Sequence, residues 1–278
     1  MSLRINTNTG SAFASYQLQK NQQALSESLN RISTGQRINR SSDDAAGMVI
    51  ANKLASQSQG FGQAIRNAND AISITQVADG ALGQAMDLIQ NIRVKAIQAA
   101  SAAQSPENRS AIQMDIDNSL AALSDITQNT SFNGQKLLSG AFTDKQFQVG
   151  ISPGETIEIS ISSIDPAQIS DQALGSFADI DVTTQEGAQA AIGLADTALD
   201  YISQQRSNIG SRQNQLESTI NNLSNSRINT MSAESQIRDL DYAEEAMNLS
   251  KIKLLAKAKS FALAQSNTNA KNIVDIFE

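Results

Sequence analysis

The chain has 278 residues, of which 40% are apolar but only 4% aromatic, and Trp is absent. A thick globular core is therefore not expected, whereas the thin interior of a helical rod suits this composition. The chain also lacks Cys and His, which excludes disulfides and thiolate metal sites and removes the commonest general base.

Charge is unevenly distributed along the chain. Residues 1–40 carry a net charge of +4 and residues 250–278 a net charge of +3. Because the whole chain carries −7, the residues between them carry −14. This pattern suggests that the two ends lie together, apart from the middle. The alternative is that the charges only decorate solvated helix faces. The acidic total and the lack of aromatics among the basic residues argue against nucleic-acid binding.

The first segment predicts an amphipathic helix over 1–33. Leu25, Leu29 and Ile32 recur at steps of four and three, which places them on one helix face. A short connector over 34–44 is expected to follow, because Gly35 suits a helix stop and Asp43 and Asp44 suit a helix start.

A long helical pattern then begins near Asp43 and extends to about Ala103. At 1.5 Å per residue such a helix would be about 90 Å long, which favours a bundle or rod. Glycines within it leave open whether it is continuous. Its expected packing stripe is Leu54, Phe61, Ile65 and Ile72. A shorter helix is expected from Ile112 to Leu123.

Residues of about 140–165 change to a period of two, the pattern of strands. Apolar residues alternate with polar ones on both sides of Pro153-Gly154, which predicts a β-hairpin. The predicted fold class is therefore mainly α, a long helical bundle or coiled-coil rod with a small β-hairpin region and with the N- and C-terminal helices paired.

The helical pattern resumes at about 183–229. Five residues at steps of seven form one coiled-coil-like seam: Ala195, Ile202, Ile209, Leu216 and Leu223. A second connector is expected over 230–238, followed by a helix over 239–278 that pairs with the first helix of the chain. The stripe of this last helix is Leu240, Met247, Leu254 and Phe261. A helix with one apolar stripe must bury it against another helix, in the same chain or in a neighbour, so we expect the stripes of the first and last helices to mediate self-assembly.

Candidate chemistry is weak throughout. Ser250 and Lys253 match a serine–lysine nucleophile pattern, but they lie on an amphipathic helix with no accompanying site. The lysines at 251, 253, 257 and 259 could contact anionic membranes, although a solvated helix face explains them better. No stretch approaches the ~20 apolar residues of a membrane span, and the first ten residues lack the apolar core of a signal peptide. We therefore expect no catalytic, cofactor or metal site and no membrane partner.

Several long motifs, in order, resemble bacterial flagellin. They are Ile5–Asn8, Leu29–Asn39, Asp43–Gly47, Asn67–Ser73, Ser131–Gly134, Arg206–Asn214 and Asp239–Ala243. The resemblance covers nearly the whole chain. The closest alternative is a hook–filament junction protein, but proteins of that class usually match the motifs at 67–73 and 206–214 less well. A secreted enzyme with flagellin-like ends is disfavoured by the lack of His, Cys and an inserted domain.

The resemblance implies a domain plan and a function. Residues 1–33 and 239–278 would form the inner D0 helix pair, and 45–229 the D1 rod, with no room for D2 or D3. The chain would self-assemble into an extracellular flagellar filament for swimming after export by the flagellar type III apparatus. Its expected partners are copies of itself, an export chaperone, the filament cap and the hook-junction proteins.

The chain departs from the family at two places. The four lysines of the last helix replace a stretch that is usually rich in Gln. Asn91 and Lys95 stand where flagellins sensed by the toll-like flagellin receptor typically have Arg and Leu, while Arg93 remains. These changes imply weak activation of that receptor.

Overall fold

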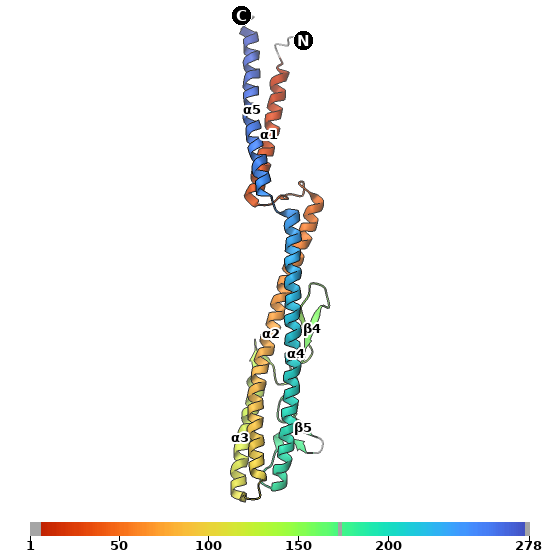
Figure 1. Cartoon of the computed structure of the whole chain (residues 1–278), viewed down its shortest axis with the longest axis vertical. Helices are drawn as coiled ribbons and strands as arrows, with labels where there is room; N and C mark the ends of the chain where they lie inside the picture. The colour runs from red at the N-terminus through yellow and green to blue at the C-terminus, as the bar shows by residue number, and fades with distance from the viewer. Residues whose placement is uncertain (1–6, 172–173, 276–278) are drawn as a thin grey trace. The chain divides into compact units, whose positions relative to one another are not determined.

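The computed structural model describes residues 7–171 and 174–275, and these residues are mainly helical (Figure 1). The helices are α1 (Thr9–Thr34), α2 (Ala45–Ala100), α3 (Pro106–Asn129), α4 (Gln185–Arg238) and α5 (Tyr242–Asp275). The predicted fold class is confirmed. Ile5 and Asn6 of the first flagellin-like motif, and the tail beyond residue 275, lie outside the described residues.

Short antiparallel strand pairs lie between α3 and α4. They are β1 (Ser131–Phe132) with β2 (Gln135–Lys136), β3 (Lys145–Gln148) with β4 (Thr156–Ile159), and β5 (Ser170–Asp171) with β6 (Gly175–Ser176), and a 3-10 turn, Phe177–Asp179, follows. In the β3–β4 hairpin Phe147 faces Ile157. Ile157 and Ile159 are buried while Glu158 is exposed, which is the alternation that the sequence predicted.

The chain divides into two compact units. The terminal unit comprises Met1–Ser58 and Ile228–Glu278, and the central unit comprises Gln59–Arg227. The division falls inside α2 and α4, so each of these helices contributes to both units. It therefore does not coincide with the connectors that the sequence suggested as domain boundaries.

The expected connector at 230–238 is wrong, because α4 continues through Arg238. The stretch contains no Pro or Gly. Arg238 Nη1 lies 3.8 Å from Oε1 of Glu234, which is one helical turn earlier. The break comes instead at Asp239–Asp241. There the Asp241 carboxylate accepts hydrogen bonds from the N–H groups of Ala243 and Glu244 and so caps α5.

The core of the central unit lies between α2, α3, α4 and the strand pairs. Figure 1 shows the three helices side by side in this unit. The contact face of α2 follows alternating steps of three and four and consists largely of small residues. It includes Ala64, Ala68, Ala71, Thr75, Ala78, Leu82, Ala85, Ile89, Ile92, Ala96 and Ala99, all buried. Small side chains allow helices to approach closely, so this unit is thin yet well packed.

In the terminal unit α1 and α5 run antiparallel, side by side (Figure 1). Gly35 ends α1 in the left-handed conformation, with φ of 70°, and its N–H donates to the Arg31 carbonyl at 2.9 Å. The chain segments that follow α1 and precede α5 are joined by backbone hydrogen bonds. Arg37 N donates to Arg238 O at 2.7 Å and Leu240 N to Gly35 O at 3.0 Å.

Candidate assembly surfaces

The predicted apolar stripe of α5 points away from α1. Met247, Leu254 and Phe261 are 69%, 68% and 72% exposed, and we call these three residues the α5 stripe. Leu240, the first member of the predicted stripe, lies before α5 and is half-buried. An apolar row at steps of seven that nothing in the described chain covers is a surface suited to another molecule.

A different face of α5 contacts α1. Its half-buried and buried positions follow steps of four and three: Glu245, Leu249, Ile252, Ala256, Lys259 and Leu263. The matching positions of α1 are Ala14, Leu18, Asn21, Leu25, Ser28 and Ile32. This is coiled-coil spacing, but the buried members described in the two helices are Asn21, Ser28, Glu245 and Ile252. We call this contact the polar seam.

Hydrogen bonds to backbone atoms supply much of what the polar seam lacks in apolar contact. Asn21 Nδ2 donates to Ile252 O at 3.0 Å, and Tyr242 Oη donates to Ile32 O at 3.0 Å. Lys259 Nζ donates to Gln17 O at 3.3 Å. Each such bond adds only about 1 kcal/mol net, so the pair is held weakly.

The predicted stripe of α1 is divided between the two faces. Leu25 and Ile32 are half-buried in the polar seam, whereas Leu29 is 47% exposed. Phe13 and Tyr16, which the sequence analysis did not single out, are exposed by 65% and 61%. Both helices of the pair therefore present large apolar side chains to solvent.

The central unit buries the seam predicted on α4. Ala195, Ile202, Ile209, Leu216 and Leu223 are all at most 9% exposed. The stripe predicted on α2 lies beside the contact face rather than at its centre, since Leu54, Phe61, Ile65 and Ile72 are only half-buried. Alanines make most of the α2 contact face. Because Ala is only weakly hydrophobic, the spacing of large apolar residues did not reveal this face.

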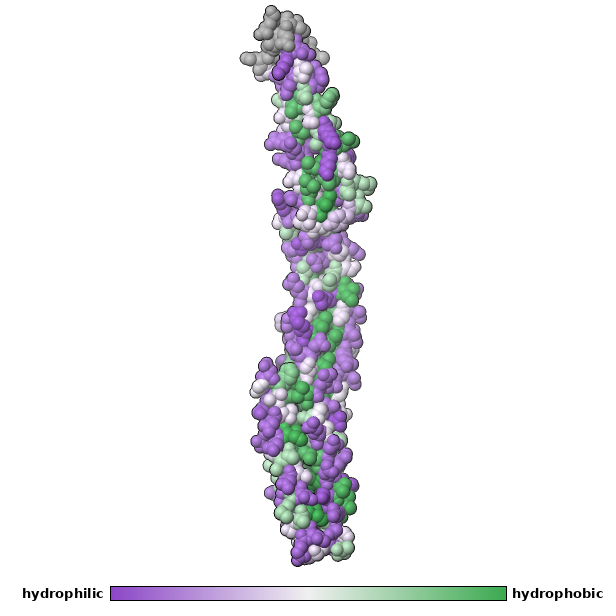
Figure 2. All heavy atoms as spheres, turned by 90° about the vertical axis from the view of Figure 1, so that its left-hand side faces the viewer, coloured by the Kyte–Doolittle hydropathy of each residue, from purple (hydrophilic) through white to green (hydrophobic). Residues whose placement is uncertain are grey.

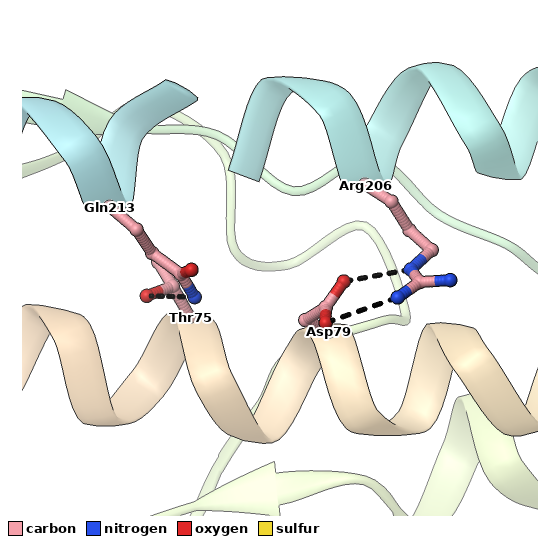
Figure 3. A network of polar contacts seen from close by, with 4 residues as sticks. All are labelled: Thr75, Asp79, Arg206 and Gln213. Atoms are coloured by element: carbon pink, nitrogen blue, oxygen red, sulfur yellow. Dashed lines mark hydrogen bonds and ion pairs between the residues drawn. The ribbon is translucent and has the colours of Figure 1, made fainter. Parts of the chain in front are cut away.

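Polar side chains also join α2 to α4, both in this thin core and at its edge (Figure 3). Arg206 Nε lies 2.8 Å from Asp79 Oδ1, and a second guanidinium nitrogen lies 3.3 Å from Oδ2. One turn of α2 earlier, Gln213 Nε2 donates to the buried Thr75 Oγ1 at 3.2 Å. The hydrogen bond to Asp79 raises the pKa of Arg206 further above its already high value. These contacts help to set the register of the two helices.

The face expected to meet an immune receptor is on α2. Asn91 is exposed. Arg93 Nε lies 2.5 Å from Oδ1 of Asp196 on α4, and Lys95 Nζ lies 2.6 Å from Oδ2 of Asp115 on α3. The two cations therefore reach toward different neighbouring helices, and both pairs are half exposed.

Within residues 7–171 and 174–275 there is no group of acidic, His or Cys side chains that could hold a metal ion. In the same ranges no helix is both long and apolar enough to cross a membrane. On the face drawn in Figure 2, hydrophobic side chains are interrupted by hydrophilic ones in both units.

The described residues form a mainly helical protein that exposes large apolar side chains on α1 and α5. Comparison with known proteins agrees. Residues 5–143 match the bacterial flagellin N-terminal helical region, and residues 192–277 match the bacterial flagellin C-terminal helical region. The chain belongs to the bacterial flagellin family.

Individual relatives support this assignment. The chain is 36% identical to flagellin of Halalkalibacterium halodurans over 250 residues, which is 90% of each chain. It is 30% identical to the flagellar filament 31.3 kDa core protein of Treponema maltophilum, over 99% of each. A putative flagellar hook-associated protein from Vibrio parahaemolyticus has a TM-score of 0.61 at 14% identity, covering 71% of this chain and 100% of that one. This last likeness shows a shared fold alone and does not favour the hook-junction alternative.

Proposed function

We propose that this chain is the structural subunit of a flagellar filament, built by copies of itself outside the cell. The observation that carries the proposal is the exposed α5 stripe, together with membership of the flagellin family. The α5 stripe fits a neighbouring copy through a different surface of that copy. Repeated contacts between two different surfaces generate an open helical filament when the rotation between neighbouring copies does not close into a ring.

Seeded assembly tests the proposal directly. Purified monomer mixed with short preformed filaments of the same protein should lengthen them, as seen by electron microscopy. Monomer that remains folded and dispersed in the presence of competent seeds would overturn the proposal.

The domain plan is part of the proposal. Residues 1–33 and 239–278 would form the D0 pair at the filament core, and 45–229 the D1 rod around it, without D2 or D3. The weakly held α1–α5 pair supports this division, because a unit with a polar seam and exposed apolar faces gains most of its order from neighbours. A cryo-electron microscopy map of the filament would test the plan by placing α1 and α5 nearest the axis.

We further propose export by the flagellar type III apparatus, with an export chaperone, the filament cap and the hook-junction proteins as partners. The exposed α5 stripe gives a chaperone an apolar helix face to cover before assembly. Phe261→Asp should weaken chaperone binding, measured by calorimetry, while Lys136→Asp on the central unit should leave it unchanged. We propose no catalytic activity for the chain.

Weak activation of the toll-like flagellin receptor is proposed from the α2 face. The Asn91 side chain is neutral. Lys95 forms an ion pair with Asp115, and taking this pair into a desolvated contact is less favourable than burying an apolar Leu there. Arg93 is retained but is engaged by Asp196. The double change Asn91→Arg with Lys95→Leu should raise signalling by monomer in a cell reporter assay. Strong signalling by the unaltered monomer would contradict the proposal.

A further inference from the structure

The methionines of this chain are its oxidisable sulfur groups. There are six of them and no cysteine, and a thioether is oxidised where the oxidant can reach it. Met114, Met231 and Met247 are 60%, 49% and 69% exposed, whereas Met48 and Met86 are half-buried. Met247 is thus the most exposed methionine among the residues that the structure describes.

Met247 also differs from the other methionines in its position, because it is a member of the α5 stripe. The α5 residues that contact α1 include Glu245 and Leu249, each of which lies two residues from Met247. At 3.6 residues per turn, a step of two residues leads to nearly the opposite side of a helix. A chemical change at the Met247 sulfur therefore alters the outer face of α5 and leaves the polar seam untouched.

The chemistry at this sulfur needs only a two-electron oxidant. A lone pair of Met247 Sδ attacks one oxygen of hydrogen peroxide, and an S–O bond forms as the O–O bond breaks. The proton of the transferred hydroxyl passes to the departing hydroxide, which leaves as water. The sulfur is oxidised by two electrons to the sulfoxide, and the peroxide is reduced. Methionine sulfoxide reductases reverse the step with two thiols, which become a disulfide while the oxygen leaves as water.

The sulfoxide changes the α5 stripe from apolar to polar at one position. A thioether is flexible and apolar, whereas a sulfoxide carries a strong hydrogen-bond acceptor. In the monomer water hydrates this oxygen, because Met247 is mostly exposed. When a neighbouring copy covers the stripe, the oxygen loses that water and gains no donor from an apolar contact, which is unfavourable. The cost therefore falls on assembly and not on the fold of the monomer.

We propose that Met247 is a redox-sensitive modification site, at which peroxide oxidation of the monomer weakens its addition to a filament and reduction restores it. This inference rests on the proposed function, because it takes the α5 stripe to be the surface that a neighbouring copy covers. It adds a regulator of that surface, a two-electron oxidant such as hydrogen peroxide. The competing explanation is that oxidation of Met114 on α3 or Met231 on α4, both outside the stripe, impairs assembly instead.

Peroxide treatment of monomer variants separates the two explanations. For each variant, the critical concentration for seeded elongation after treatment is divided by the value for untreated protein of the same variant. This ratio should be about five or more for the unaltered chain, which corresponds to one buried acceptor left without a partner. Met247→Leu, which stays apolar but cannot form a sulfoxide, should bring the ratio close to one. Met114→Leu and Met231→Leu are the matched controls and should leave the ratio raised.

Two further measurements follow the same sulfur. Peptide mass spectrometry should show that Met247 gains oxygen severalfold more slowly in filaments than in monomer, since a neighbouring copy covers it there. Treatment of oxidised monomer with methionine sulfoxide reductases for both epimers and a dithiol should return the critical concentration to its untreated value. The circular dichroism of the monomer should be the same before and after oxidation.

A ratio near one for the unaltered chain, with Met247 fully converted to the sulfoxide, would overturn the inference. A raised ratio that Met247→Leu does not lower would overturn it as well, and so would equal rates of Met247 oxidation in monomer and filament. Elongation of seeds by untreated monomer supports the proposed filament function in each of these cases, so the two claims fail separately.

Discussion

The two compact units share a heptad spacing, but the residues that this spacing buries are apolar in the central unit and mostly polar in the terminal unit. In the central unit the repeat buries Ala, Ile and Leu, and α2 packs against α4 through a continuous apolar face. In the terminal unit the repeat buries Asn21, Ser28 and Glu245, while Leu254 and Phe261 remain exposed. A coiled-coil repeat therefore shows which residues share a face, whereas the residue types on that face decide whether the contact is complete within one chain.

The contrast has an energetic meaning. Burying a full Leu or Ile side chain contributes roughly 1.5–3 kcal/mol, and the central unit does so many times. The polar seam substitutes hydrogen bonds of about 1 kcal/mol each. We therefore expect the central unit to hold its fold as a monomer and the terminal unit to gain order when other copies cover it.

The largest expected effect comes from charging the α5 stripe. Phe261→Asp or Leu254→Asp should abolish seeded elongation, because a charge buried in a contact without a partner costs several kcal/mol. The monomer should remain folded, since both positions are exposed in it. Electron microscopy and circular dichroism report the two properties separately. Ser260→Asp, at a neighbouring exposed position, is the control, and normal filaments from both stripe variants would refute this role of the α5 stripe.

The next largest effect compares cavities in the two units. Leu216→Ala should lower the free energy of unfolding by about 2–5 kcal/mol, the usual cost of truncating a fully buried Leu. Ile252→Ala in the polar seam should leave the main urea transition unmoved, because that transition reports the central unit. A shift of similar size for both variants would mean that the two units unfold together.

A smaller effect is expected from the polar network of the central unit. Thr75→Val keeps the shape of a fully buried side chain but removes the acceptor for Gln213. The free energy of unfolding should fall by about 1 kcal/mol. Adding Gln213→Leu should recover part of that loss, since it removes the amide left without its partner. Urea unfolding measures both, and a larger loss in the double variant would argue against a direct contact.

The smallest effect concerns pH and Asp43 in the connector. Hydrogen bonds from the backbone N–H groups of Arg40 and Asn39 lower the pKa of the Asp43 carboxyl. A lowered folded-state pKa means that this stabilisation is present above the unfolded pKa of about 3.9 and is lost as pH falls through the folded value. Proteolysis within residues 34–44 by an acid-active protease should therefore increase at low pH. In Asp43→Asn that part of the pH dependence should disappear.

The sequence predicted a packing face correctly where its side chains are large and missed it where they are small. The seam of α4 was visible because Ile202, Ile209 and Leu216 are large, and they are buried as the spacing indicates. The contact face of α2 was missed because alanines such as Ala68 and Ala78 carry little hydrophobic signal. The prediction selected the larger apolar residues beside these alanines, and those residues lie at the margin of the contact.

Two further differences have clear physical causes. The end of α4 was mistaken for a connector because residues 230–238 are polar and lack an apolar stripe, although they contain good helix formers. The polar seam escaped notice because Ser28 and Glu245 do not register in hydrophobic periodicity. The α5 stripe was visible in the sequence as a row that another helix must bury, but its spacing alone did not show whether that helix is α1 or belongs to another molecule.

Hydrogen exchange measured on monomer and filament under identical conditions tests the central contrast most directly. Amides of α2, α3 and α4 in the central unit should be protected in both states, because their core is complete within one chain. Amides of α1 and α5 should exchange rapidly in the monomer and become strongly protected in the filament. Equal protection of α1 and α5 in the two states would contradict the account, since it would show that the terminal unit needs no neighbour to hold its fold.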